Sequence, residues 1–451
     1  MNETLRPDSI RPAGAMLSHA SRNYLLIVLA IISMTSWADR AIFNLLAESI
    51  KRDLHLSDTE IGMLGGIAFA ALYALLSLPI ARIAERKSRL GITIAAVTIW
   101  SFMSMICAAA SNFWQLAAAR AGVGIGESAC LPAAQSMISD TFPADRRATA
   151  ISIYTLGIPV GTVVGILVGA RVAEAFTWRA AFIAAGAPGL LLAVLAWLTL
   201  KEPVRGRFDP PSHETPPSLA YVVRHLWSRH AFRHLLVGVT VGTAMNAGMG
   251  AFMAPFVLRS SSLGLDLSGF AMLSVALVGF GTFAGALAGG PLADRLARRD
   301  QKWTLWVPGV AFLVGGPAWA AAFISDSLPP FICLALVGQA AVAVYVAPTF
   351  GALNNMVEPR MRATAVAVIG LINGIIGLGI GPVLVGFGSD YAAHTIFETN
   401  SNASFWGLRT ALVAASLVYL WASFHYFRAG SRLRESLLIS HLDEPQVQSA
   451  K

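Results

Sequence analysis

Two pairs of opposite charges interrupt apolar stretches of this sequence. Asp39 and Arg40 are adjacent within the run 24–46, and Arg120 and Glu127 stand seven residues apart in "RAGVGIGE". Seven residues are close to two helical turns, so Arg120 and Glu127 share one face of a helix. A charge at the centre of a bilayer costs at least about 2.5–3.5 kcal/mol, and such residues usually face an interior and pair. The four charges sum to zero, which predicts one buried network.

The two carboxylates of this network are candidate proton carriers. Arginine stays charged, whereas a desolvated carboxyl beside an arginine can be pushed towards either protonation state. If the arginine contacts differ between two conformations, the acid binds a proton in one and releases it in the other. All nine histidines lie in tails, loops or at the ends of apolar segments. We therefore expect Asp39 and Glu127 to couple to protons, with Glu127 preferred because Asp39 has an immediate arginine neighbour. The alternative is a permanent network that only holds helices together.

The composition indicates which elements must hold these charges. Hydrophobic residues make up 55% of the 451-residue chain and charged residues 13%, and the mean hydropathy is +0.62. Soluble globular proteins carry about 25% charged residues. The sequence therefore predicts an all-α membrane protein with twelve transmembrane helices, each near the roughly 20 residues that cross a bilayer. The twelve apolar segments begin near Tyr24, Thr59, Leu90, Phe113, Ala148, Ala180, Phe232, Ser268, Trp303, Pro330, Ala363 and Trp406.

The lysines and arginines predict the orientation of these helices. Of the 33 basic residues, 18 fall in even-numbered connections and only six in odd-numbered ones. Basic residues stay on the cytoplasmic side during insertion, so we expect both termini to be cytoplasmic. The net charge of +8 then faces anionic lipid head groups, and no soluble domain is left to bind nucleic acid. We expect a monomer in a bacterial inner membrane.

Matching segments divide the chain into two halves. "ARIAERKSR" at 81–89 is echoed by "GPLADRLARR" at 290–299, and "ADRRATAIS" at 144–152 by "EPRMRATAVAV" at 358–368. Repeats of this kind are typical of transporters built from two related bundles. The predicted division is a cytoplasmic tail 1–22, a six-helix half 23–200, a cytoplasmic linker 201–230, a second half 231–428 and a cytoplasmic tail 429–451. The linker is expected to contain a basic amphipathic helix on the inner membrane surface, the alternative being a hydrated linker.

These features resemble the major facilitator superfamily over nearly the whole chain. The stretches "SWADRAIFNLLAESIKRDLHLSDTEIGML", "AARAGVGIGESACLPAAQSMISD" and "GIPVGTVVGILVG" are similar to its spinster branch. The resemblance implies a lysophospholipid or sphingosine-type substrate and transport linked to a proton gradient. The Asp-Arg pair and the "GxGE" pattern also resemble organic-anion transporters of the same superfamily, so a proton-linked organic-anion carrier stays open as the alternative.

The resemblance also assigns a gate to the two basic loops. In the superfamily, the acid of this motif caps a helix of the opposite half and pairs with arginines when the inner side is closed. Carried over, Glu85 and Asp294 take the acid role. The first copy departs from the family pattern at Ala81, Glu85 and Ser88, and the alternative is charge that only sets topology. The candidate partners are Arg86, Arg89, Arg146, Arg295, Arg298 and Arg362.

A cavity between the halves is expected to be charged on one wall and apolar on the other. No Asp, Glu, Lys or Arg lies near the middle of the last six segments. This asymmetry suits an amphiphile whose head group binds near Arg40 and Arg120. The alternative is that the apolar candidates face lipid. The candidate cavity residues are Met249, Phe252, Met253, Phe256, Tyr345 and Asn373.

Enzymatic chemistry finds no support in the sequence. Cys107, Cys130 and Cys333 lie in apolar segments without CxxC spacing, and no catalytic triad, metal-ligand set, cofactor motif or ATPase motif appears. A receptor or structural membrane protein is disfavoured by the repeat and the buried acids. We therefore predict a secondary active transporter that works by alternating access, without cofactor or metal. Its partners would be the amphiphilic or organic-anion substrate, protons and membrane lipids.

Overall fold

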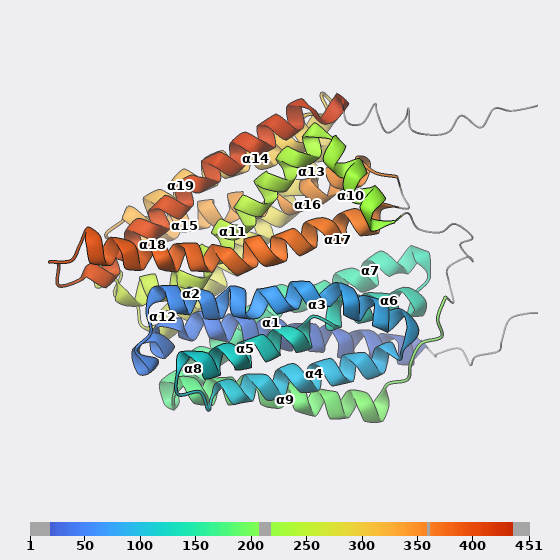
Figure 1. Ribbon diagram of the computed structural model, residues 1–451, viewed down its shortest axis with the longest axis horizontal. Helices are drawn as coiled ribbons and strands as arrows, with labels where there is room; N and C mark the ends of the chain where they lie inside the picture. Colours follow the sequence, from blue (N-terminus) through green and yellow to red (C-terminus); the bar gives the residue numbers. More distant parts are fainter. Residues whose placement is uncertain (1–18, 207–217, 359–360, 436–451) are drawn as a thin grey trace, which may run out of the picture.

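The computed structural model describes residues 19–206, 218–358 and 361–435, and no strand occurs within these ranges. Figure 1 shows two layers of helices, the first half of the chain below and the second half above. The predicted all-α class is thus confirmed. In the first half the helices are α1 (His19–Leu54), α2 (Asp58–Gly65), α3 (Ile67–Arg86), α4 (Arg89–Cys107), α5 (Phe113–Glu127), α6 (Cys130–Thr141), α7 (Ala144–Thr155), α8 (Gly157–Ala175) and α9 (Trp178–Thr199).

The second half repeats this pattern after the linker helix α10 (Leu219–Ser228). Two of its membrane-length helices contain a π-helical stretch, η1 (Leu277–Thr282) and η3 (Asn373–Ile380), and π-helical turns often occur at functional sites. Its other helices are α11 (His230–Arg259), α12 (Leu267–Ala276), α13 (Phe283–Ala297), α14 (Trp303–Ile324), α15 (Leu328–Ala343), α16 (Val346–Asn355), α17 (Arg362–Ile372), α18 (Gly381–Thr395) and α19 (Ala403–Ser431).

Eleven helical segments of the described chain are long and apolar enough to cross a membrane. The segment predicted to begin near Phe113 is not among them, and in the structure it forms α5 and α6 with a turn at Ser128 and Ala129, directly after Glu127. Neither piece reaches membrane length alone. The fourth crossing is therefore a broken helix, and its break lies beside one of the predicted proton carriers.

Close backbone contact fixes α1 against α8. A Cβ atom at Gly165 would lie 2.6 Å from the Cα of Ala38, a separation that real Cβ atoms do not show. Small residues let membrane helices approach in this way. The contact fixes the register of α1 at the residue directly before Asp39, and so it holds the first charged pair at a defined depth.

The first and last helices extend slightly beyond the predicted boundaries of the two halves. The described part of the first tail already begins α1 at His19, and α19 continues to Ser431; residues 1–18 and 436–451 lie outside the described ranges. Within the linker, α10 buries Val222 and Leu226 against α17 and the start of α11. An amphipathic linker helix is thus present, and its location on the membrane surface stays a prediction.

Candidate functional site

Two ion pairs join α1 to α5. Arg40 donates from Nη2 and Nε to Oε2 of Glu127, at 2.5 and 2.6 Å, and Arg120 Nη1 lies 3.4 Å from Asp39 Oδ2. Asp39, Arg120 and Glu127 are almost fully buried, whereas the Arg40 side chain is 17% exposed. The four charges therefore lie together as one neutral network, with each pair crossing between the two helices.

Two further helices complete the network with residues that the sequence analysis did not single out. Ser104 of α4 donates a hydrogen bond from its hydroxyl to Oδ1 of Asp39. Phe69 of α3 lies beside both guanidinium groups, with its ring centroid 4.7 Å from Cζ of Arg40 and 5.0 Å from Cζ of Arg120. An aromatic face stabilises a desolvated cation by about 2 kcal/mol. Phe69 thus connects the two ion pairs.

More aromatic rings surround Arg40. Its Cζ lies 4.9 Å from the ring centroid of Trp37 and 4.8 Å from that of Tyr73, which stacks on Phe69 at 5.7 Å. Phe69 and Tyr73 stand four apart in the segment after Asp39 and Arg40, so they share a helical face. This four-residue spacing is the feature of the sequence that could have indicated the two rings. It is also typical of any apolar helix face, so it does not identify them as partners of an arginine.

The two acids differ in how many of their oxygens are engaged. Asp39 uses Oδ1 with Ser104 and Oδ2 with Arg120. Glu127 uses only Oε2, and its buried Oε1 has no hydrogen-bond partner. An unpartnered buried acceptor costs about 1–3 kcal/mol. A proton can therefore bind Oε1 of Glu127 without displacing a contact, whereas a proton on Asp39 would replace one.

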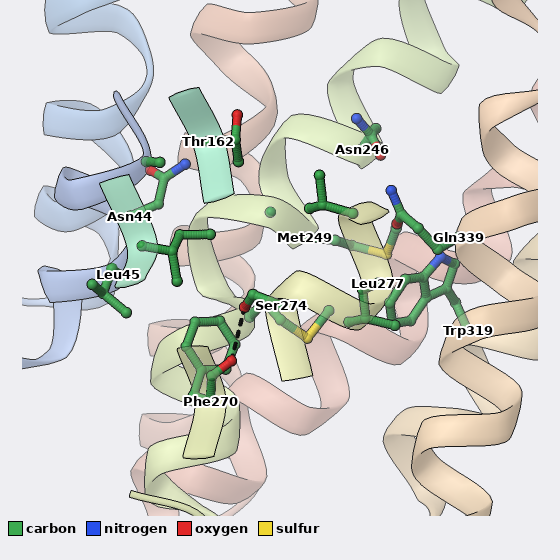
Figure 2. A pocket seen from close by; sticks show the side chains of 15 residues that line it. Asn44, Leu45, Thr162, Asn246, Met249, Phe270, Ser274, Leu277, Trp319 and Gln339 are labelled. Atoms are coloured by element: carbon green, nitrogen blue, oxygen red, sulfur yellow. Dashed lines mark hydrogen bonds between the residues drawn. The ribbon is translucent and has the colours of Figure 1, made fainter. Parts of the chain in front are cut away.

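A cavity of about 210 Å³ lies between the two halves. In Figure 2, Asn44 and Leu45 are on one side, and Asn246, Met249, Leu277, Trp319 and Gln339 are on the other. None of its lining residues is charged, so the wall from the first half is neutral, in contrast to the expectation. The lining residues are Ala41, Asn44, Leu45, Thr162, Ile166, Asn246, Met249, Gly250, Met253, Phe270, Ser274, Leu277, Val278, Trp319 and Gln339.

The charged network nevertheless lies close to this cavity along the chain. Asn44, a lining residue, follows Arg40 by four positions and so lies one turn along the same face of α1. Arg40 is also the only charge of the four with substantial exposure. The network therefore stands one helical turn from the cavity, with Arg40 as the charge nearest to it along that face.

The six cavity candidates from the sequence divide into two groups. Met249 and Met253 line the cavity. The other four are absent from its lining, because their side chains are engaged in packing or hydrogen bonds inside the second half. Phe252 is fully buried, Phe256 packs on Phe323 at 5.1 Å, Tyr345 packs on Phe312 at 5.4 Å, and Asn373 accepts a hydrogen bond from Thr240 at 2.9 Å.

One end of the bundle is closed by charged contacts between the halves. Arg259, the last residue of α11, donates to Glu48 of α1 at 2.7 Å and to both oxygens of Asp58 of α2 at 2.7 and 2.8 Å. Lys51 also pairs with Asp58, at 2.6 Å. We call this group, Glu48, Lys51, Asp58 and Arg259, the far-end cluster. The feature of the sequence that could have indicated this cluster is Arg259 itself, an isolated arginine at the end of the seventh apolar segment.

The far end also shows a helix capped by the opposite half. The carboxylate of Asp390 in α18 accepts hydrogen bonds from the backbone N–H groups of Asp58 and Thr59, at 3.1 and 2.7 Å. These groups belong to the first turn of α2, where N–H groups lack partners within the helix. The resemblance assigned such a capping role to Glu85 and Asp294. In this structure Asp390 performs it, at the other end of the bundle.

The predicted gating residues lie at the end where the linker helix α10 stands, which we call the linker end. Arg89 is buried and pairs within its own half, with Asp140 and with Glu202 at 3.1 Å. Arg362 donates to the backbone oxygen of Asn354 at 3.2 Å, also within one half. Among the described side chains, which do not include those of Glu85 and Asp145, the ion pairs that Arg89 forms at this end lie within one half. The side chain of Glu85 lies outside the described part. The remaining candidates are exposed, namely Arg86, Arg146, Asp294, Arg295 and Arg298.

Glu202, just beyond α9, holds the start of α4. Partial burial alone would raise the pKa of Glu202. Hydrogen bonds from Ser88 and from the backbone N–H groups of Leu90 and Arg89 outweigh that effect and keep this pKa below its usual value. The basic loop of the first half is therefore fixed by a charged carboxylate of the same half.

Comparisons with known proteins agree with this architecture. The family model described as "Major Facilitator Superfamily" matches residues 29–382. An "MFS-type efflux pump" of Mycolicibacterium smegmatis is 31% identical over 412 residues, which are 91% of this chain and 93% of that protein. "Protein spinster homolog 3" of Danio rerio is 26% identical over 409 residues, 86% of this chain and 80% of that protein.

A solved structure extends the similarity to three dimensions. The crystal structure of a bacterial homolog of the human lysosomal transporter Spinster, in an inward-facing and unoccupied conformation, superposes with a TM-score of 0.86 at 30% identity. The match covers 93% of this chain and 99% of that one. The inward-facing, occupied conformation gives a TM-score of 0.81.

Proposed function

This chain belongs to the major facilitator superfamily and is a membrane transport protein related to the spinster proteins, and we propose that it is a proton-coupled carrier of an amphiphilic, lipid-like molecule. The observation that carries the proposal is the buried Arg40–Glu127 pair, one helical turn from a cavity between the halves. The relatives named as spinster proteins and as an efflux pump support transport of this kind. We place the protein in a bacterial inner membrane.

The cavity supports an amphiphilic substrate of the lysophospholipid or sphingoid type. Methionine, leucine, isoleucine and aromatic side chains supply an apolar surface for a chain, and Asn44, Asn246 and Gln339 supply amide groups. Mostly apolar pockets with a few polar groups fix the orientation of their ligands through those groups. Because the lining is uncharged, Arg40, one helical turn from the lining residue Asn44, would neutralise an anionic head group.

Proton coupling would act through the Arg40–Glu127 pair. A proton that binds Oε1 of Glu127 neutralises the carboxylate and leaves Arg40 without a counter-charge. Arg40 can then bind an anionic head group in place of Glu127, held meanwhile by the faces of Trp37, Phe69 and Tyr73. Proton binding and head-group binding therefore favour each other.

Alternating access would exchange which end of the bundle is closed. In this structure the far-end cluster and Asp390 join the halves, while at the linker end Arg89 pairs within its own half. With the linker in the cytoplasm, this corresponds to a conformation open to the inside. The similarity to inward-facing structures of a bacterial relative supports the same assignment.

Transport by purified protein in liposomes tests the proposal. A pH gradient is imposed, and uptake of a lysophospholipid and of a sphingoid phosphate is compared with uptake of small carboxylates. We expect the amphiphiles to accumulate and a protonophore to abolish that accumulation. Movement of the carboxylates alone would replace the amphiphile by an organic anion, and amphiphile transport that ignores the protonophore would remove the proton from the mechanism.

A further inference from the structure

A second cavity, of about 290 Å³, lies wholly within the second half, between α13, α14 and α15/α16. Its lining consists entirely of apolar side chains, and those of Leu292, Val310 and Val314 are exposed. The cavity therefore opens on the outer surface of the bundle, which faces lipid in a membrane protein. We call it the outer groove. Its lining residues are Leu292, Leu296, Trp303, Val307, Val310, Ala311, Val314, Ala341 and Val344.

A basic loop lies at one end of the outer groove. It connects α13, which carries the lining residues Leu292 and Leu296, to α14, which begins at the lining residue Trp303. Leu292 and Leu296 are one turn apart, and Arg295, directly before Leu296, lies about 60° around the helix from Leu292 and about 100° from Leu296. The basic residues of this loop are Arg295, Arg298, Arg299 and Lys302.

The three arginines of this loop have no acidic partner among the described residues. Arg295, Arg298 and Arg299 are all exposed, and no ion pair within the described ranges includes them. Lys302 differs, since it pairs with Asp300 at 3.1 Å and lies 4.7 Å from the ring centroid of Trp306. An anion can therefore bind the arginines without first displacing a carboxylate.

At one repeat position the two halves differ in how an arginine is paired. The offset of 209 that matches Glu85 with Asp294 also matches Arg89 with Arg298. Arg89 is buried and paired with Asp140 and Glu202. Arg298 is exposed and has no such partner. The same repeat position thus serves internal packing in the first half and is available to an external anion in the second.

We propose that the outer groove holds one acyl chain of an anionic phospholipid whose phosphate binds Arg295 and Arg299. Lipid tails are as apolar as leucine, so the groove alone selects weakly among lipids. A guanidinium donates two parallel hydrogen bonds to phosphate oxygens. Selection would come from the net negative charge of the head group, because a zwitterionic lipid brings its own cation beside the same arginines. Basic pockets between membrane helices on the cytoplasmic side bind such head groups, and Trp303 stands at the groove where interfacial tryptophans are favoured.

Native mass spectrometry of the purified full chain tests this site. The protein is mixed with equal amounts of phosphatidylglycerol and phosphatidylcholine that carry identical acyl chains, and bound lipid is counted. We expect wild type to retain phosphatidylglycerol preferentially. Each arginine near a membrane surface contributes about fivefold in affinity, so R295Q/R299Q is expected to reduce the preference to near that for phosphatidylcholine. R86Q, in the matching loop of the first half, is the control and should leave the preference unchanged.

A second variant tests the acyl chain separately. Val310 is exposed at the groove, so V310W fills the groove without entering the core, and we expect it to lower retention of both lipids. Unchanged phosphatidylglycerol preference in R295Q/R299Q would overturn the head-group assignment. Unchanged retention in V310W, or displacement of bound phosphatidylglycerol by millimolar inorganic phosphate, would show that no acyl chain occupies the groove. The site does not depend on the proposed substrate or on proton coupling.

Discussion

Arg40 and Glu127 form the closer of the two ion pairs between α1 and α5, at 2.5 Å, against 3.4 Å for Arg120 and Asp39. Arg40 is the one partly exposed member of the network. Glu127 is the carboxylate with an oxygen, Oε1, that accepts no hydrogen bond. Under the proposed function the two acids have different tasks. Glu127 can take up a proton beside the cavity, while Asp39 ties α1, α4 and α5 together.

The first prediction separates these two acids. In liposomes, E127Q is expected to abolish the effect of a pH gradient on amphiphile uptake while leaving exchange of bound substrate intact, because glutamine cannot take up the proton. D39N is expected to keep the pH effect and to lower the thermal stability, since Asp39 accepts from both Ser104 and Arg120. The reverse pattern, with the pH effect lost in D39N and kept in E127Q, would assign the proton to Asp39.

The second prediction concerns Phe69. F69L removes the aromatic face that both guanidinium groups share, and two cation–π contacts of this kind are worth about 2–4 kcal/mol together. We expect a lower unfolding temperature and weaker substrate binding in F69L. A leucine side chain keeps this position apolar and buried, so the loss of stability and binding would report the missing aromatic ring. F69Y keeps the ring at the same position and is the matched control; equal losses in the two variants would argue against the cation–π contribution.

The third prediction concerns the far-end cluster. R259Q leaves the buried carboxylates of Glu48 and Asp58 without their shared cation, and breaking a buried pair in this way costs about 3–5 kcal/mol. The closed far end should therefore become less populated. Hydrogen–deuterium exchange read by mass spectrometry is expected to show faster exchange over residues 55–65.

The control for that experiment is R179Q. Arg179 pairs with Asp53 at 2.5 Å, also at the far end, but both residues belong to the first half. Its loss should leave exchange in residues 55–65 unchanged. Equal acceleration in both variants would mean that the exchange reports general loss of charge at this end, and protection in R259Q would show that Arg259 does not hold the halves together.

The fourth prediction concerns pH and the linker end. The pKa of Glu202 is lower in the folded protein than its usual value, so its carboxylate stabilises the fold at pH above that usual value. The contribution is lost as the pH falls through the folded-state pKa. E202Q should therefore lower the unfolding temperature at pH 7, and the difference from wild type should shrink towards pH 4. E435Q removes the exposed pair with Arg432 and should change little at either pH; a Glu202 effect that grows with acidity would contradict the assignment.

The sequence by itself determined the class of protein and the inventory of its charges. An apolar composition requires membrane helices, and the energetic cost of charge in a bilayer requires Asp39, Arg40, Arg120 and Glu127 to lie inside and to be balanced. The repeat of the basic loops likewise indicates two related halves. These conclusions depend on residue type and on spacing along one chain, which the sequence contains in full.

Only the tertiary structure decided which side chains meet. It paired Arg40 with Glu127, placed Phe69 between two cations, left the cavity wall uncharged and capped the first turn of α2 with Asp390. It also placed Met249 and Met253 at the lining of the cavity between the halves. The physical reason is that each of these contacts depends on the rotation and depth of one helix against another. Close backbone approach, as at Gly165 and Ala38, sets that rotation, and spacing along a single helix does not contain it.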